Sequence, residues 1–121
     1  MQGHYVQAAS LRMDPDADLA APGAAITLEL CGSWDHVPPC PLAPHHTSPE
    51  RNGDVDVVEL RVVFAAEPAQ EGEVRRRIVK ALAPGSLTGP DGVTTEWSLL
   101  GSGAAALSGA ELELAKRIAA S

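Results

Sequence analysis

The stretch VDVVELRVVFA, residues 55–65, decides the fold of this chain. Apolar and charged residues alternate along it, as in a β-strand that buries one face and wets the other. Val58, Leu60, Val62 and Phe64 fall on one face, and Glu59, Arg61 and Val63 on the other. The consecutive valines at 57 and 58 break this phase, which predicts a bulge. We expect a central strand here.

Two amphipathic helices are predicted downstream of this strand. The first covers 68–82, with Pro68 in its first turn, an apolar stripe through Val74 and Ile78, and Pro84-Gly85 as its stop. The second covers 110–120, and Ser108 and Glu111 have the spacing of a capping box before it. Both helices have one apolar face that must pack against a sheet.

Three further strands are expected, at 4–13, 24–31 and 93–100. The segment 24–31 alternates cleanly, with Ile26, Leu28 and Leu30 on one face. The element order is then β-β-β-α-β-α. Such a chain forms an α+β two-layer sandwich, a four-stranded and mostly antiparallel sheet with two helices on one face. The other face of the sheet is left uncovered.

Length and charge narrow the possible functions. The 121 residues form a single domain, 1–121, and 45% of them are hydrophobic, enough for a core. The net charge is −7, and the first 70 residues carry ten acidic groups against three arginines. Nucleic acid and anionic membranes require a positive face, so neither is expected as a partner. No signal peptide or membrane span is recognised, which predicts a cytoplasmic protein. Seven arginines against two lysines suggest a bacterial origin.

The region 32–54 is predicted to be a long loop rich in Pro, Cys and His. Its five prolines disfavour a helix or a central strand, and connections of this length are usually functional or disordered. Both cysteines and three of the four histidines of the chain lie within sixteen residues here or directly before: Cys31, His36, Cys40, His45 and His46.

This cluster predicts a metal site. Thiolate and imidazole are the preferred ligands of zinc, and copper or iron would also accept them. The spacing C-x4-H-x3-C-x4-H-H matches no common zinc motif, so it does not fix which of His45 and His46 is a ligand. Four ligands would make a structural zinc site. Three would leave an open, catalytic one, with Glu29 or Asp35 as candidate general base and a substrate that the sequence does not identify.

A metal-free enzyme that acts on a small molecule in a cleft of the sheet face stays open, although the sequence selects no substrate for it. Three further alternatives stay open at this point. In one, the protein is a non-enzymatic module that binds a partner, or a second copy as a homodimer through the uncovered sheet face, and the Cys/His loop is a structural staple. In another, Cys31 or Cys40 is a nucleophile, with one of the loop histidines as base and Asp35 to orient it. In the third, the cysteines form a disulfide or are simply buried, and the histidines have no special role.

Three smaller motifs favour structural interpretations. The acidic run Asp14-x-Asp16-x-Asp18 lacks the glycine and the glutamate of a calcium loop, so we interpret it as a solvated turn. The basic cluster 75–80 fits a solvated helix face, with an anion or an acidic partner as its alternative. Gly101-x-Gly103 is too short for a phosphate-binding pattern and is interpreted as a turn or bulge.

Overall fold

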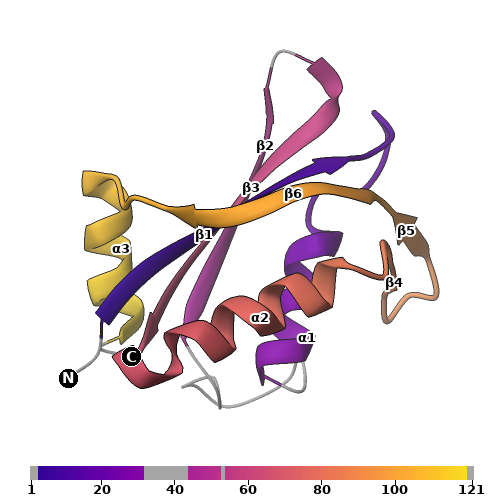
Figure 1. Ribbon diagram of the computed structural model, residues 1–121. Helices are drawn as coiled ribbons and strands as arrows, with labels where there is room; N and C mark the ends of the chain where they lie inside the picture. Colours follow the sequence, from indigo (N-terminus) through magenta and orange to yellow (C-terminus); the bar gives the residue numbers. More distant parts are fainter. Residues whose placement is uncertain (1–2, 32–43, 53, 120–121) are drawn as a thin grey trace.

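The computed structural model describes residues 3–31, 44–52 and 54–119, and in this range it has six strands, three α-helices and a 3-10 turn (Figure 1). In chain order these are β1 (Gly3–Arg12), α1 (Ala21–Cys31), β2 (His45–Asn52), β3 (Asp54–Ala66), η1 (Pro68–Gln70), α2 (Glu71–Leu82), β4 (Ser86–Thr88), β5 (Thr94–Glu96), β6 (Ser98–Ala105) and α3 (Gly109–Ala119).

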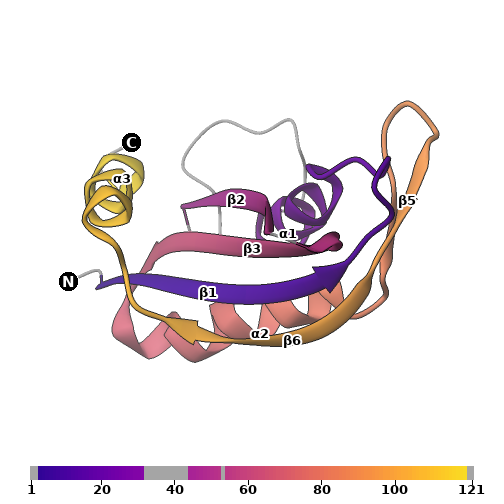
Figure 2. The same cartoon turned by 90° about the horizontal axis from the view of Figure 1, so that it is seen from above.

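Four strands form one antiparallel sheet in the order β2-β3-β1-β6 (Figure 2). Strands β4 and β5 form a separate two-stranded hairpin. Without this hairpin and α3, the chain follows the order β-α-β-β-α-β, in which each crossover helix skips one strand. This is the ferredoxin-like arrangement, built from two split βαβ units.

Helices α1 and α2 lie together on one face of the sheet (Figure 1). Residues 55–65 lie in β3, and their predicted apolar face, from Val58 to Phe64, is buried against these helices. Helix α1 contributes Ile26 and Leu30, and α2 contributes Ile78 to the same core. The α+β fold class and the antiparallel four-stranded sheet are thus confirmed.

Helix α3 packs on the opposite face of the sheet. Ala115 is buried there against Val6 of β1 and Val63 of β3. The predicted capping box is present: the Glu111 backbone N–H donates to Ser108 Oγ, and Glu111 Oε1 accepts from the Ser108 backbone N–H. The two predicted helices therefore lie on different faces, and it is α1 that joins α2.

Glu111 also anchors α3 to the sheet. Arg61 Nε of β3 donates to Glu111 Oε2 at 2.7 Å. This hydrogen bond, together with those from Ser108 and the charge of the guanidinium, outweighs desolvation and lowers the Glu111 pKa to about 2. The same pair raises the Arg61 pKa.

The predicted strand 24–31 is wrong, because the segment is helical and belongs to α1. Its buried residues follow helical spacing: Ala21, Ala25, Ile26 and Leu30 face the core. Leu28, which the alternation predicts on the buried face, is 39% exposed. Pro22 lies near the start of the helix, where its missing N–H costs nothing.

The interpretation of 32–54 as one loop is also wrong, since β2 occupies His45–Asn52. Pro49 sits inside this strand, which is possible because β2 is at the edge of the sheet and needs donors on one side only. For Gly101-x-Gly103 the turn is wrong, because both glycines lie in β6, whereas the bulge is supported, because the β1–β6 register shifts at Leu100, directly before Gly101.

The β4–β5 hairpin is fastened to the end of α2. Gly85 turns the chain after α2 with φ of 73°, and its carbonyl accepts from the Trp97 backbone N–H at 2.8 Å. The Trp97 ring is buried, and its Nε1 donates to the Leu82 carbonyl at 3.0 Å. The hairpin therefore has a fixed base beside the N-terminal half of α1.

Candidate functional site

The structure does not support a metal-binding protein, and that prediction is corrected here. Among the described residues there is no group of three or more His, Cys, Asp or Glu side chains that could hold a metal ion. His45 and His46 are consecutive in β2, so their side chains point to opposite faces of the sheet. His45 lies on the helix-covered face, where its Nε2 is 2.9 Å from Thr27 Oγ1 of α1.

Three of the five proposed ligands lie outside this test. His36 and Cys40 fall outside the described residues, and so does the side chain of Cys31. The same holds for Asp35, for the thiol chemistry considered for this segment, and for zinc as the bound cofactor. These assignments stay predictions.

Glu29, the other candidate base, joins the two helices of the core face. Its Oε1 lies 3.4 Å from Lys80 Nζ and 3.7 Å from Arg77 Nη1, both on α2. The atom is buried and makes no hydrogen bond within the described residues. Glu29 thus faces two cations across the α1–α2 contact, an arrangement that orients helices.

The basic cluster of α2 is engaged within the molecule. Arg75 Nη1 donates to the Val6 carbonyl and to Gln7 Oε1, both at 2.8 Å, and Arg75 Nε donates to Glu71 Oε2. Arg76 pairs with Glu73. Through these contacts the arginines tie α2 to β1 and to its own first turn, as the structural interpretation of the cluster expects.

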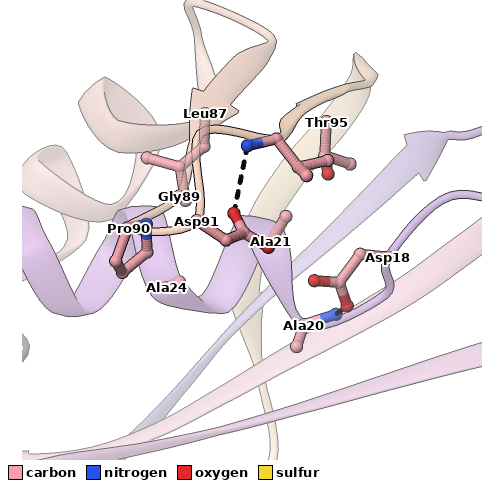
Figure 3. A pocket seen from close by; sticks show the side chains of 10 residues that line it. Asp18, Ala20, Ala21, Ala24, Leu87, Gly89, Pro90, Asp91 and Thr95 are labelled. Carbon is pink, nitrogen blue, oxygen red and sulfur yellow. Dashed lines mark hydrogen bonds between the residues drawn. The ribbon is translucent and has the colours of Figure 1, made fainter.

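A pocket of about 460 Å³ lies between the start of α1 and the β4–β5 hairpin (Figure 3). We call it the α1–hairpin pocket. Alanines form its helix wall, while Leu87, Pro90 and Val93 form most of the hairpin wall. Its full lining is Asp18, Ala20, Ala21, Ala24, Leu87, Gly89, Pro90, Asp91, Val93 and Thr95. The pocket exists because methyl side chains on α1 leave unfilled the space that the hairpin encloses.

Two aspartates are the charged residues of this lining. Asp18 Oδ1 accepts from the Ala20 backbone N–H at the entry to α1, and Asp91 Oδ1 accepts from the Val93 backbone N–H in the hairpin turn, both at 3.0 Å (Figure 3). These bonds hold each carboxylate in place on an otherwise apolar rim. The pocket is therefore apolar inside and negatively charged at two points.

The surroundings of the pocket are acidic as well. A second cleft of about 370 Å³ shares Asp18, Val93 and Thr95 with it and adds the exposed carboxylates of Asp14, Asp16 and Glu96. Arg51 contacts this loop through its Nη2, which donates to the carbonyls of Asp14 and Pro15. A third cleft continues past Glu96 and includes Arg12. All three aspartates of the run Asp14-x-Asp16-x-Asp18 therefore lie at this end of the molecule.

The sheet offers two other surfaces, an open face and an edge. The part of the open face not covered by α3 holds a shallow groove of about 240 Å³, where Glu59 accepts hydrogen bonds from Ser10 Oγ. Glu50 of β2 stands directly opposite Glu59 in the register. Strand β6 forms one edge of the sheet and β2 the other (Figure 2).

Sequence reasoning missed the α1–hairpin pocket, although signals for both walls are present. Ala-Ala-Pro-Gly-Ala-Ala, residues 20–25, after Asp18 has the capping residue, early proline and alanines of a helix start. Gly89-Pro90-Asp91-Gly92 between threonines is typical of a hairpin turn. That these two segments meet is a tertiary fact that neither signal contains.

Neither a protein-family model nor a curated protein matches this sequence. The fold and the pocket therefore carry the functional argument alone. Within the described ranges, no helix has the length and apolar content required to cross a membrane.

Proposed function

We propose that this protein binds a small molecule with an apolar body in the α1–hairpin pocket. The observation that carries the proposal is the pocket itself. Its volume, about 460 Å³, falls in the range of small-molecule sites, and its walls are mainly apolar with few polar groups. Backbone hydrogen bonds fix those polar groups before any ligand arrives.

The surrounding architecture supports a preformed site. One wall is the first half of α1, which is anchored in the core through Ala25 and Ile26. The other wall is a hairpin whose base is fixed by Gly85 and Trp97. A pocket between two anchored walls costs little reorganisation on binding, and preorganisation of this kind favours affinity.

Titration with 2-phenylethanol, a neutral probe with an apolar ring, tests this function. We expect saturable shifts of the backbone amide resonances of Ala21, Ala24 and Thr95, with a dissociation constant on the order of 1 mM for so small a molecule. Ala24→Trp places a large ring in the cavity and should weaken binding at least about tenfold.

The control for this variant is Ala69→Trp, the same change at an exposed residue of η1. It should leave binding unchanged, and thermal unfolding of both variants shows whether they are folded. If the wild type shows no saturable shifts, or if Ala24→Trp binds the probe as the wild type does, the pocket is not a ligand site.

Self-association is a second candidate, and a specific observation favours it. The β2 edge contains Pro49, Glu50 and Arg51, features that protect an edge strand from pairing with another chain. The β6 edge, Ser98–Ala105, has no charge and no proline, and it carries Leu100 with 50% exposure. We infer that two copies pair through β6 in a homodimer.

The uncovered sheet face is the weaker surface for a homodimer. Helix α3 already covers one end of it, and Glu50 and Glu59 lie on the part that stays open. Two such faces in contact would bring like charges together, which is unfavourable. From the composition, we still predict that the protein is bacterial and cytoplasmic and that it does not bind nucleic acid.

A further inference from the structure

We propose that the ligand of the α1–hairpin pocket is a cationic amine with an apolar body, an inference that rests on the proposed function. The pocket alone selects an apolar group. Its two aspartates, Asp18 and Asp91, select the charge that the ligand carries next to that group.

Each aspartate has a carboxylate oxygen to offer a ligand. Asp18 Oδ1 and Asp91 Oδ1 hold backbone N–H groups, and these bonds set the orientation of both side chains. A carboxylate oxygen accepts more than one hydrogen bond, and its partner oxygen adds further acceptor capacity. An ammonium group has three donors and can therefore bind at the rim while the backbone contacts persist.

The charge around the pocket favours the same ligand. No lysine, arginine or histidine is among the described residues that line the pocket or the adjoining cleft. Asp14, Asp16 and Glu96 extend the negative potential along that cleft. The positive end of the α1 dipole lies beside the pocket and opposes a cation, and the negative charge of Asp18, just before the helix, offsets it.

The apolar interior supplies the rest of the selectivity. Inorganic cations keep their hydration in a pocket with methyl groups on its floor, and no described group of carboxylates could coordinate a metal ion. An organic ammonium instead places its hydrocarbon against Ala21, Ala24 and Leu87 and leaves its charge at the wet rim. The class that fits is a primary amine carrying one ring or a short alkyl chain.

The test compares 2-phenylethylamine with 2-phenylethanol, which share the ring and differ in charge. At low ionic strength we expect the amine to bind about tenfold more tightly, and we expect added salt to reduce this preference. In the double variant Asp18→Asn/Asp91→Asn, the amide oxygens still accept the backbone hydrogen bonds. This double variant should bind the amine no more tightly than the alcohol.

Asp16→Asn is the matched control, because it removes a charge from the adjoining cleft and not from the pocket. If both probes bind equally to the wild type, the amine inference is wrong and the proposed function stands. If Asp16→Asn removes the preference as fully as the double variant does, the pair is not the recognition element. If neither probe binds, the proposed function fails, and the inference fails with it.

Discussion

Gly85 shows how one residue holds a pocket wall. Its φ of 73° lies in the left-handed region, and a Cβ added there would stand 2.5 Å from the Trp97 carbonyl oxygen. Gly85→Ala should therefore lower the free energy of unfolding by about 2 kcal/mol, through backbone strain and this clash. Urea denaturation measures the change.

The control for Gly85 is Gly72, in the exposed first turn of α2, where an added Cβ meets nothing within 4 Å. Gly72→Ala should raise the free energy of unfolding by about 0.5–1 kcal/mol, because alanine restricts the unfolded chain and favours a helix. Equal effects of the two substitutions would contradict the special role of Gly85.

Glu111 gives the fold a dependence on pH. Its pKa is about 2 in the folded protein, because Arg61 and Ser108 stabilise the carboxylate, whereas the usual value is 4.5. Its contribution to stability is therefore complete above the unfolded pKa and is lost as the pH falls from about 5 towards 2. Glu111→Gln should lower the free energy of unfolding at pH 7 by about 1 kcal/mol and make its acid decline shallower.

Glu113→Gln is the comparison for this effect, since Glu113 is 73% exposed and lies 3.8 Å from Lys116 on the same helix. It should follow the wild-type profile within about 0.5 kcal/mol. Chemical denaturation at a series of pH values measures all three proteins. If Glu111→Gln also has the wild-type acid decline, Glu111 does not keep its low pKa in solution.

At the scale of elements, Arg75 links α2 to the sheet. Its side chain is 19% exposed and lies over the rings of Tyr5 and Phe64, and its Nη1 atom donates to Val6 and Gln7. Arg75→Ala should lower the free energy of unfolding by about 2–3 kcal/mol, because buried acceptors lose their donor. Arg76→Ala removes a 63% exposed partner of Glu73 and should cost under about 1 kcal/mol. Thermal unfolding experiments measure both variants. If Arg75→Ala and Arg76→Ala lose the same stability, Arg75 does not link α2 to the sheet.

How far the sequence predicts each element depends on how local its signal is. The helices at α2 and α3 were predictable because each has an apolar stripe that agrees with a local end signal, Pro84-Gly85 after α2 and the capping box before α3. In α1, Ile26, Leu28 and Leu30 satisfy a strand pattern by chance. The alanines that favour a helix here differ little in hydrophobicity from their neighbours. The helical period of the buried residues is therefore not visible in the sequence.

The sequence does not predict strand β2, for a different reason. Its proline and charges contradict a central strand, and only its position at the sheet edge makes them acceptable. Its place at the edge depends on β1, which lies far from it along the chain and occupies the other side of β3. The α1–hairpin pocket is unpredictable in the same way, since its walls are Ala20–Ala24 and Leu87–Thr95. The cysteines and histidines suggest a metal site by their chemical type alone. Residue type does not show which side chains lie close together in the fold.

At the scale of the whole molecule, the two edges of the sheet differ in how readily they can pair with a strand of another chain. Antiparallel pairing of β6 with β6 of a second copy satisfies a two-fold axis, so the same contacts form twice. A chain with a net charge of −7 repels its copies, and the uncharged β6 edge is a surface where this repulsion is weakest. Leu100 falls at the register shift, between Gly101, which pairs with Ser10, and Leu99, which pairs with Leu11. Its exposed side chain would gain burial in the pair.

Leu100→Lys should therefore weaken self-association at least about tenfold, because the pairing would desolvate two ammonium groups near the axis. Val93→Lys, the same kind of change at a 60% exposed hairpin residue, should leave it unchanged. Analytical ultracentrifugation over a concentration series measures both variants. Amide hydrogen exchange locates the interface. With rising protein concentration, protection from exchange should increase in β6 and stay constant in β2. A wild type that is monomeric at every concentration, or equal behaviour of the two lysine variants, would exclude the β6 edge as a dimer interface.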